Sequence, residues 1–155
     1  MGINRGKQFE EQIRNALKVV PQTLVVRMYD QMSGFKGSTN ICDFVAYHYP
    51  HIYLFECKSC YGNTLNFNNI TENQWKGLLE VSSYAGVVAG YFIWFIDHDI
   101  TIFVSADSMQ YLKQHGDKSF HVTKSLEKLE GTYYIVPGTK KRILFDYDLR
   151  EFIGE

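Results

Sequence analysis

Two charged residues stand inside an otherwise aromatic and aliphatic run, IYLFECKSC, at residues 52–60. In a strand, residues two apart share a face, so Glu56 and Lys58 point one way while Cys57 points the other. Taken alone, the pair is typical of a surface ion pair at the end of an edge strand, which contributes little stability. The Glu-x-Lys pattern therefore indicates chemistry only if other elements bring further groups to the same face.

A second carboxylate precedes this run at a useful distance. Residues 41–49 and 52–59 predict two strands joined by a very short turn, which is an antiparallel hairpin. Such a hairpin places Asp43 beside Glu56. Carboxylates that close repel each other unless a cation compensates them, and Mg²⁺ suits a sparse set of oxygen ligands. The predicted metal site contains Asp43, Glu56 and the backbone carbonyl of Cys57, with Lys58 near enough to orient or activate an attacking water.

The elements that must position these groups alternate along the chain. A polar, glycine-bearing loop, residues 30–40, interrupts them, and the last forty residues mix strand and turn. We predict an α/β fold with a mixed central sheet flanked by helices, in the order α-β-β-β-α-β. The expected elements are a helix over 6–19, strands over 23–29, 41–49 and 52–59, a helix over 71–85, strands over 87–97 and 100–106, and a short helix over 108–114.

Length and composition restrict the class of protein. A chain of 155 residues with 45% hydrophobic content is expected to form a single domain, with the motif-bearing core in residues 5–105 and peripheral elements in 106–155. No apolar run approaches the roughly 20 residues that span a bilayer, so a cytoplasmic protein without membrane contact is expected. The three cysteines are expected to be reduced thiols. A net charge of -1 neither indicates nor excludes nucleic acid.

These motifs resemble those of the PD-(D/E)xK nuclease superfamily, and within it the Holliday junction resolvases of the RecU type and their archaeal counterparts. Cys42 stands where the superfamily's name has proline, and loop 30–40 is shorter than the stalk of RecU-type enzymes. The resemblance spans residues 5–105 and implies a restriction-endonuclease-like core. The matching residues are Gly6, Phe9 and Glu10 in G-x-x-F-E; Ser38, Thr39, Asp43 and Phe44 in STNICDF; Phe55, Glu56 and Lys58 in FECK; and Gln74 in NFNNITENQ.

The resemblance implies a Mg²⁺-dependent homodimer that cleaves four-way DNA junctions by paired, symmetric nicks. Mn²⁺ is expected to substitute for Mg²⁺, and the products are expected to carry 5′-phosphate ends. Archaeal resolvases often carry a catalytic serine in the corresponding loop, and either Ser33 or Ser38 fits that place. The implied metal-site and catalytic residues are Glu10, Asp43, Glu56 and Lys58, with Gln74 as a secondary candidate.

Several residues also fit structural roles. Glu10 stabilises a helix N-terminus equally well, and Gln74 fits a capping box with Thr71. Cys57 and Cys60 have the spacing of half a zinc site, but no second Cys-x-x-Cys completes it, and Cys57 and Cys42 are interpreted as small core residues, Cys42 on the face of Phe44. Two further functions stay open: another nuclease of the superfamily acting on duplex DNA, and a non-catalytic protein that binds DNA structures.

Contacts to DNA and to a second subunit are expected outside the metal site. The aromatic strand 87–97 and the YYIV segment, residues 133–136, are the expected dimer surfaces. The phosphate backbone is expected to meet basic side chains with little reading of the bases. The candidate DNA-binding residues are Arg5, Lys7, Arg14, Arg27, Ser33, Phe35, Lys36, Ser38 and Lys76.

Overall fold

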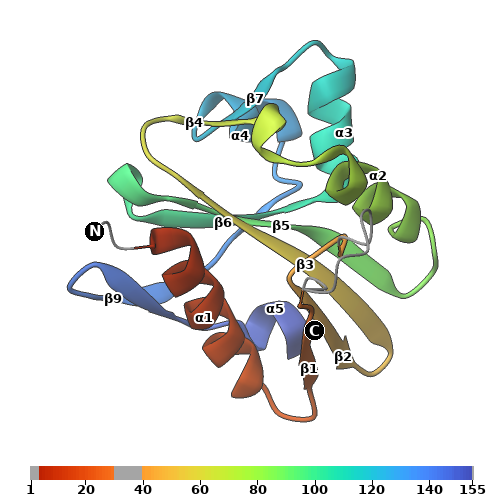
Figure 1. Ribbon diagram of the computed structural model, residues 1–155, viewed down its shortest axis with the longest axis vertical. Helices are drawn as coiled ribbons and strands as arrows, with labels where there is room; N and C mark the ends of the chain where they lie inside the picture. The colour runs from red at the N-terminus through yellow and green to blue at the C-terminus, as the bar shows by residue number, and fades with distance from the viewer. Residues whose placement is uncertain (1–3, 30–39, 155) are drawn as a thin grey trace, which may run out of the picture.

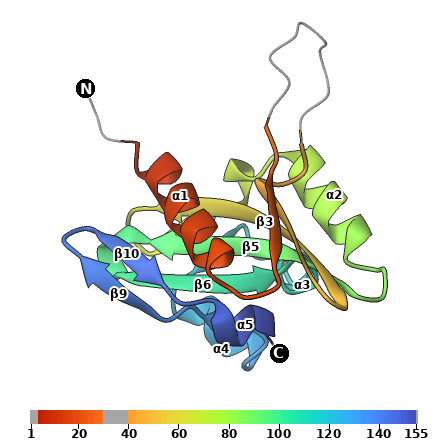
Figure 2. The ribbon, with the colours of Figure 1, turned by 90° about the horizontal axis from the view of Figure 1, so that it is seen from below.

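The structure, a computed structural model, describes residues 4–29 and 40–154. A six-stranded mixed sheet in the order β1-β2-β3-β5-β6-β8 runs through the molecule, with helices on both faces (Figures 1 and 2). The β3 and β5 strands run parallel, whereas the other neighbours in the sheet run antiparallel. The strands are β1 Leu24–Arg27, β2 Phe44–His48, β3 His51–Cys60, β5 Val87–Phe95, β6 Ile100–Ser105 and β8 Tyr134–Ile135.

The predicted hairpin is formed by β2 and β3. Its register pairs His48 with His51 at the turn and Phe44 with Phe55 at the far end. On its other side β3 pairs with β5, from Ile52 to Cys60, so β3 is a central strand. An edge-strand ion pair is therefore the wrong interpretation of Glu56 and Lys58.

Helices and two small sheets cover the two faces of the central sheet. One face carries α1 (Arg5–Lys18), α5 (Arg150–Gly154) and the hairpin of β9 (Gly138–Lys141) and β10 (Leu144–Tyr147). The opposite face carries α2, α3 and the β4–β7 pair (Figure 1). The remaining elements are α2 Glu72–Val81, α3 Ala106–Gln114, α4 Lys124–Leu129, β4 Thr64–Asn66, β7 Ser119–His121, and the 3₁₀ turns η1 Phe67–Asn69 and η2 Ile96–His98.

The first helix forms where its apolar spacing predicts. Phe9, Ile13 and Leu17 are each at most 1% exposed and pack on the sheet. The Asn4 side chain caps the helix by accepting a hydrogen bond from the Lys7 N–H. This packing fixes the orientation of α1 relative to the sheet, and with it the position of Glu10, which reaches Arg27 on β1.

The aromatic strand β5 is buried on both faces. Residues 89–95 are all buried, because β5 lies between β3 and β6 and beneath helices on both sides. The prediction that this strand supplies a dimer surface is therefore wrong. The other predicted surface includes β8, at the edge of the sheet, where Ile135 is 48% exposed.

The three cysteines are free thiols, and Cys42 and Cys57 are buried. Cys57 belongs to the same buried cluster as Phe55, as predicted, but the Cys42 side chain belongs to the cluster on the α2 side and the Phe44 side chain to the cluster on the opposite face. The predicted face of Cys42 is wrong because β2 begins only at Phe44, so the two-residue alternation does not extend back to residue 42. None of the helices within residues 4–29 and 40–154 is both long and apolar enough to span a membrane.

Candidate active site

The central sheet opens at the place where β2 and β3 part. Their pairing ends at Phe44 and Phe55, whereas β3 continues to Cys60. The Asp43 N–H still donates to the Phe55 carbonyl at 2.9 Å. The next free donor on β3, the Cys57 N–H, donates to the Asp43 carboxylate at 2.8 Å. A carboxylate thus takes the place of a main-chain acceptor at the mouth of the hairpin.

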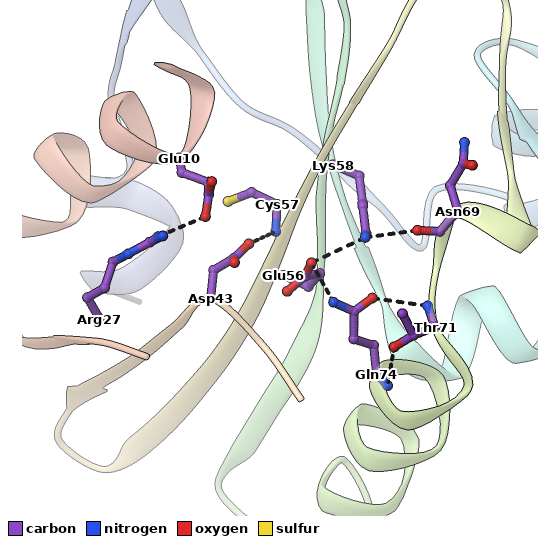
Figure 3. Close-up of polar contacts among 9 residues, drawn as sticks. All are labelled: Glu10, Arg27, Asp43, Glu56, Cys57, Lys58, Asn69, Thr71 and Gln74. Carbon is purple, nitrogen blue, oxygen red and sulfur yellow. Dashed lines mark hydrogen bonds and ion pairs between the residues drawn. The ribbon is translucent and has the colours of Figure 1, made fainter. Parts of the chain in front are cut away.

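Three carboxylates line one cavity at this opening, with a volume of about 330 Å³. Figure 3 shows Glu10 reaching in from α1 on one side and Gln74 from α2 on the other, with Asp43 and Glu56 between them. Glu56 is 5% exposed. The predicted convergence of Asp43 and Glu56, and the approach of Glu10, are therefore present in the structure.

Burial and mutual repulsion alter the ionisation of these acids. Burial, followed by the charge of Glu56, raises the pKa of Asp43 to about 8. Burial also raises the pKa of Glu56, although the nearby Lys58 opposes this shift. Both pKa values are raised because two buried negative charges side by side are unfavourable, and a cation between the carboxylates would reduce that cost.

The donor set fits a hard divalent cation, since its side-chain ligands are carboxylate oxygens. The N–H and C=O of one strand residue point to the same edge of the strand, so the Cys57 carbonyl is on the side of Asp43. Within the two described ranges, no three His, Cys, Asp or Glu side chains are grouped closely enough to hold a metal as they stand. Figure 3 shows that each of the three carboxylates accepts a hydrogen bond from a donor on the protein.

Lys58 lies at the rim, on the face of Glu56. Its ammonium donates to the Asn69 carbonyl at 2.9 Å and lies 3.4 Å from a Glu56 oxygen. The side chain is only 18% exposed, so this placement is well defined. Nothing in the sequence identifies Asn69 as the partner, because a main-chain carbonyl carries no residue signature.

Gln74 forms the predicted capping box and also contacts Glu56. Its Oε1 accepts from the Thr71 N–H and the Thr71 hydroxyl accepts from the Gln74 N–H, which completes a capping box. Its Nε2 donates to a Glu56 oxygen at 2.9 Å. The N-terminal turn of α2 is thereby connected directly to the carboxylate.

The predicted DNA-contacting residues differ in their surroundings. Arg27 donates to Glu10 at 2.8 Å, and its guanidinium lies over the Phe44 ring at 5.2 Å. Lys7 lines the cavity, whereas Arg5 donates to Gln8. The remaining candidates are Arg14, paired with Glu11 at 3.8 Å, Lys76, paired with Glu72 at 2.6 Å, and Ser33, Phe35, Lys36 and Ser38, which lie outside the described residues.

Sequence reasoning missed part of this environment. It identified Arg27 as a DNA contact and not as the partner of Glu10, which requires knowing that β1 lies beneath α1. It also missed Asn40 and Met28, which line the cavity. The only available signal was the proximity of both residues to the boundaries of loop 30–40 in the chain.

Comparison with solved structures identifies the class of fold. The structure of Hjc from Archaeoglobus fulgidus, described as a Holliday junction resolvase from an archaeal hyperthermophile, superposes with a TM-score of 0.55 at 18% sequence identity. The match covers 80% of this chain and 93% of that one. The predicted α/β fold with its mixed sheet is therefore confirmed as similar to the fold of this resolvase. A search of curated protein sequences gave no match.

The family is established by sequence. The family model RecU, Recombination protein U, matches residues 18–147, and the chain belongs to this family. The function predicted from the sequence, a Holliday junction resolvase, is thereby confirmed. A resolvase is an endonuclease that binds junction DNA, and membership of the family suggests dependence on a divalent metal.

Proposed function

We propose that the cavity at the mouth of the β2–β3 hairpin is the catalytic centre of this resolvase and that its metal is Mg²⁺, for which Mn²⁺ substitutes. The observation that carries the proposal is the convergence of Glu10, Asp43 and Glu56 on one cavity, with Lys58 at its rim. The residues that would hold the metal are Asp43, Glu56, the Cys57 carbonyl and Glu10. A divalent ion bound there supplies Lewis acidity toward the scissile phosphate and its attacking water.

The chain's own groups do the positioning. The Asn69 carbonyl holds the Lys58 ammonium beside Glu56, where it orients the attacking water and offsets the negative charge of the phosphate. Gln74 fixes the orientation of the Glu56 carboxylate through its amide. Attack in line with the 3′ oxygen as leaving group gives a 5′ phosphate and a 3′ hydroxyl.

The proposal is tested with equal concentrations of a four-way junction, a linear duplex and a single strand at matched salt. We expect Mg²⁺ or Mn²⁺, but not Ca²⁺, to support paired nicks in the junction. Asp43→Asn and Glu56→Gln should abolish cleavage while binding persists, and Asp146→Asn, at an exposed aspartate outside the cavity, should cleave normally. Cleavage in excess EDTA, or a fully active Asp43→Asn protein, would contradict the metal assignment. Equal cleavage of linear duplex would contradict the preference for junctions.

We also propose that the protein acts as a two-fold homodimer. Resolving a junction needs two cuts related by its approximate symmetry, and a closed isologous dimer supplies two sites in that relation. The supporting observation is a row of apolar side chains across the outer strands of one sheet face, where the register aligns Leu24, Tyr47 and Ile52. These residues are 63%, 43% and 42% exposed. An exposed apolar row of this kind is typical of an interaction surface.

A further inference from the structure

A second hollow is larger than the proposed catalytic cavity. A groove of about 740 Å³ lies between η1, the start of α2 and the end of α3, in the region where Figure 1 shows these elements side by side. Phe67, Ile70 and Trp75 form its apolar floor and are each at most 8% exposed. The floor is therefore packed against the core, and the rim carries polar and charged side chains.

The charges on the groove do not cancel. Its two carboxylates have lysine partners, since Glu72 pairs with Lys76 at 2.6 Å and Asp117 pairs with Lys128 at 2.7 Å. Lys113 and Lys118 also line the groove, and within residues 4–29 and 40–154 neither has a carboxylate at ion-pair distance. Lys76 and, to a smaller degree, Lys113 lower the pKa of Glu72, but three lysines and two carboxylates line the groove, so the rim carries a net positive charge.

One of these lysines is held in place by the floor. The Lys113 ammonium lies 4.5 Å from the centroid of the Trp75 ring, a favourable cation–π position. The Trp75 indole in turn donates to Gln110 on α3 at 2.7 Å. The main chain at Lys118 is fixed as well, because its carbonyl accepts from the Phe67 N–H. Both cations thus project from a preorganised surface.

The groove and the proposed catalytic cavity are lined by neighbouring residues of the same segments. Asn69, whose carbonyl holds Lys58, lies in the chain between Asn68 and Ile70, which line the groove. On α2, Gln74 reaches Glu56 while the next residue, Trp75, forms the floor of the groove. The cavity and the groove are therefore close together along α2, where adjacent residues belong to the two hollows.

We propose that this groove binds the phosphate backbone of the DNA arm that leads away from the cleaved phosphate, with Lys113 and Lys118 as its main contacts. The inference rests on the proposed function. Lysines contact phosphates as point charges, so binding here fixes the path of the arm and carries no base sequence. The enzyme would thereby bind a DNA arm in the groove while the strand crossover of the same junction lies at the cavity.

The test compares Lys113→Ala/Lys118→Ala with a control of equal charge, Lys18→Ala/Lys124→Ala, which removes two exposed lysines outside the groove. Binding to a four-way junction is measured in EDTA across a salt series, and melting temperatures check folding. We expect the groove variant to bind on the order of tenfold more weakly and its salt slope to fall by about 2, since each phosphate contact contributes about 0.9. The control should change neither.

Junctions with stepwise shorter arms make the test specific. The defect of the groove variant should disappear once the arms are too short to reach the groove, while cleavage at saturating DNA stays at the wild-type rate. Unchanged affinity and slope in a folded groove variant, or a defect independent of arm length, would overturn the inference even if the wild type resolves junctions. A wild type that cleaves no junction would instead overturn the proposed function. If Lys113→Ala/Lys118→Ala is unfolded, Lys113→Gln/Lys118→Gln takes its place under the same criteria.

Discussion

Each carboxylate of the cavity accepts a hydrogen bond from a different donor. Arg27 donates to Glu10, the Cys57 N–H donates to Asp43, and the Gln74 amide donates to Glu56. The donors keep three acidic groups in one small volume without a cation. The three donors come from β1, β3 and α2, so each acid is held by a different element.

Lys58 is the residue whose removal should separate catalysis from folding. Lys58→Ala should lower the cleavage rate by about 10²-fold or more, as expected for a positioned catalytic group, with an unchanged melting temperature. Single-turnover cleavage of a junction and a thermal melt measure the two effects. An unfolded variant would mean that the contacts of Lys58 with Asn69 and Glu56 are structural.

The raised pKa of Asp43 has a consequence for stability. The folded protein holds this proton up to about pH 8, whereas the unfolded chain releases it near the ordinary value of 3.8. The group therefore contributes stability at low pH that is lost as pH rises toward 8. In EDTA, Asp43→Asn should be more stable than wild type at pH 8 by about 1 kcal/mol or more, and the gap should shrink toward pH 4. Denaturant melts at both pH values measure it, and an equal gap at both would contradict the shift.

At the scale of elements, α2 combines a structural cap with a hydrogen bond to Glu56 in the proposed catalytic centre. Thr71→Ala removes the side-chain cap and should lower the free energy of unfolding by about 1 kcal/mol. It should leave cleavage unchanged, because the Thr71 N–H still donates to Gln74 and orients it. Gln74→Ala should also lower cleavage by about 10-fold or more, since it frees Glu56. Melting and cleavage measured on both variants separate the roles. Equal activity of the two variants would show that Gln74 acts only as a cap.

The elements that sequence could predict are the long ones with a clear period. The first helix, the hairpin and α2 with its Thr71 cap appear close to where apolar spacing and turn residues place them. The four short strands after residue 106 contain two to four residues each, too few to show a period. The continuous apolar run of β5 is typical of a strand covered on both faces, and its interpretation as spare surface was wrong for that reason.

The site shows the same division. Asp43 and Glu56 could be brought together by counting residues across a short turn, since hairpin register is local. The partners of Lys58 and Glu10 could not, because Asn69 contributes a main-chain carbonyl and Arg27 reaches Glu10 only through tertiary packing. The face of Cys42 could not be predicted either, because it depends on where β2 begins, and the alternation of apolar residues along the sequence does not show where a strand begins.

At the scale of the whole molecule, one sheet supports both the site and the proposed dimer surface. The elements after residue 105 pack on both faces of this sheet, and Phe152 of α5 contacts Phe103 and Tyr134. These contacts support our proposal that residues 1–155 form a single nuclease domain. The exposed row of Leu24, Tyr47 and Ile52 crosses β1, β2 and β3, with Tyr47 and Ile52 at the turn end of the hairpin and Asp43 and Glu56 at its opposite end.

The dimer can be tested by placing charge in that row. Tyr47→Asp should give a monomer by light scattering, because a buried unpaired carboxylate at a two-fold axis is strongly unfavourable. The monomer should nick a junction once but lose paired cutting. Val19→Asp, at a more exposed apolar residue beyond the end of α1, is the matched control and should remain dimeric. A wild-type protein that is monomeric while resolving junctions fully would exclude the dimer.

The hydrogen bond from the Cys57 amide to Asp43 makes this backbone N–H a reporter of the charge on the Asp43 carboxyl group. Most strand amides donate to neutral carbonyls, whereas this one donates to a group whose charge changes with protonation and with cation binding. Its chemical shift in an amide NMR spectrum therefore follows events at Asp43 without any DNA being present. Titration with Mg²⁺ or with acid can thus be observed at one backbone position in the intact protein, even in variants that cannot cleave.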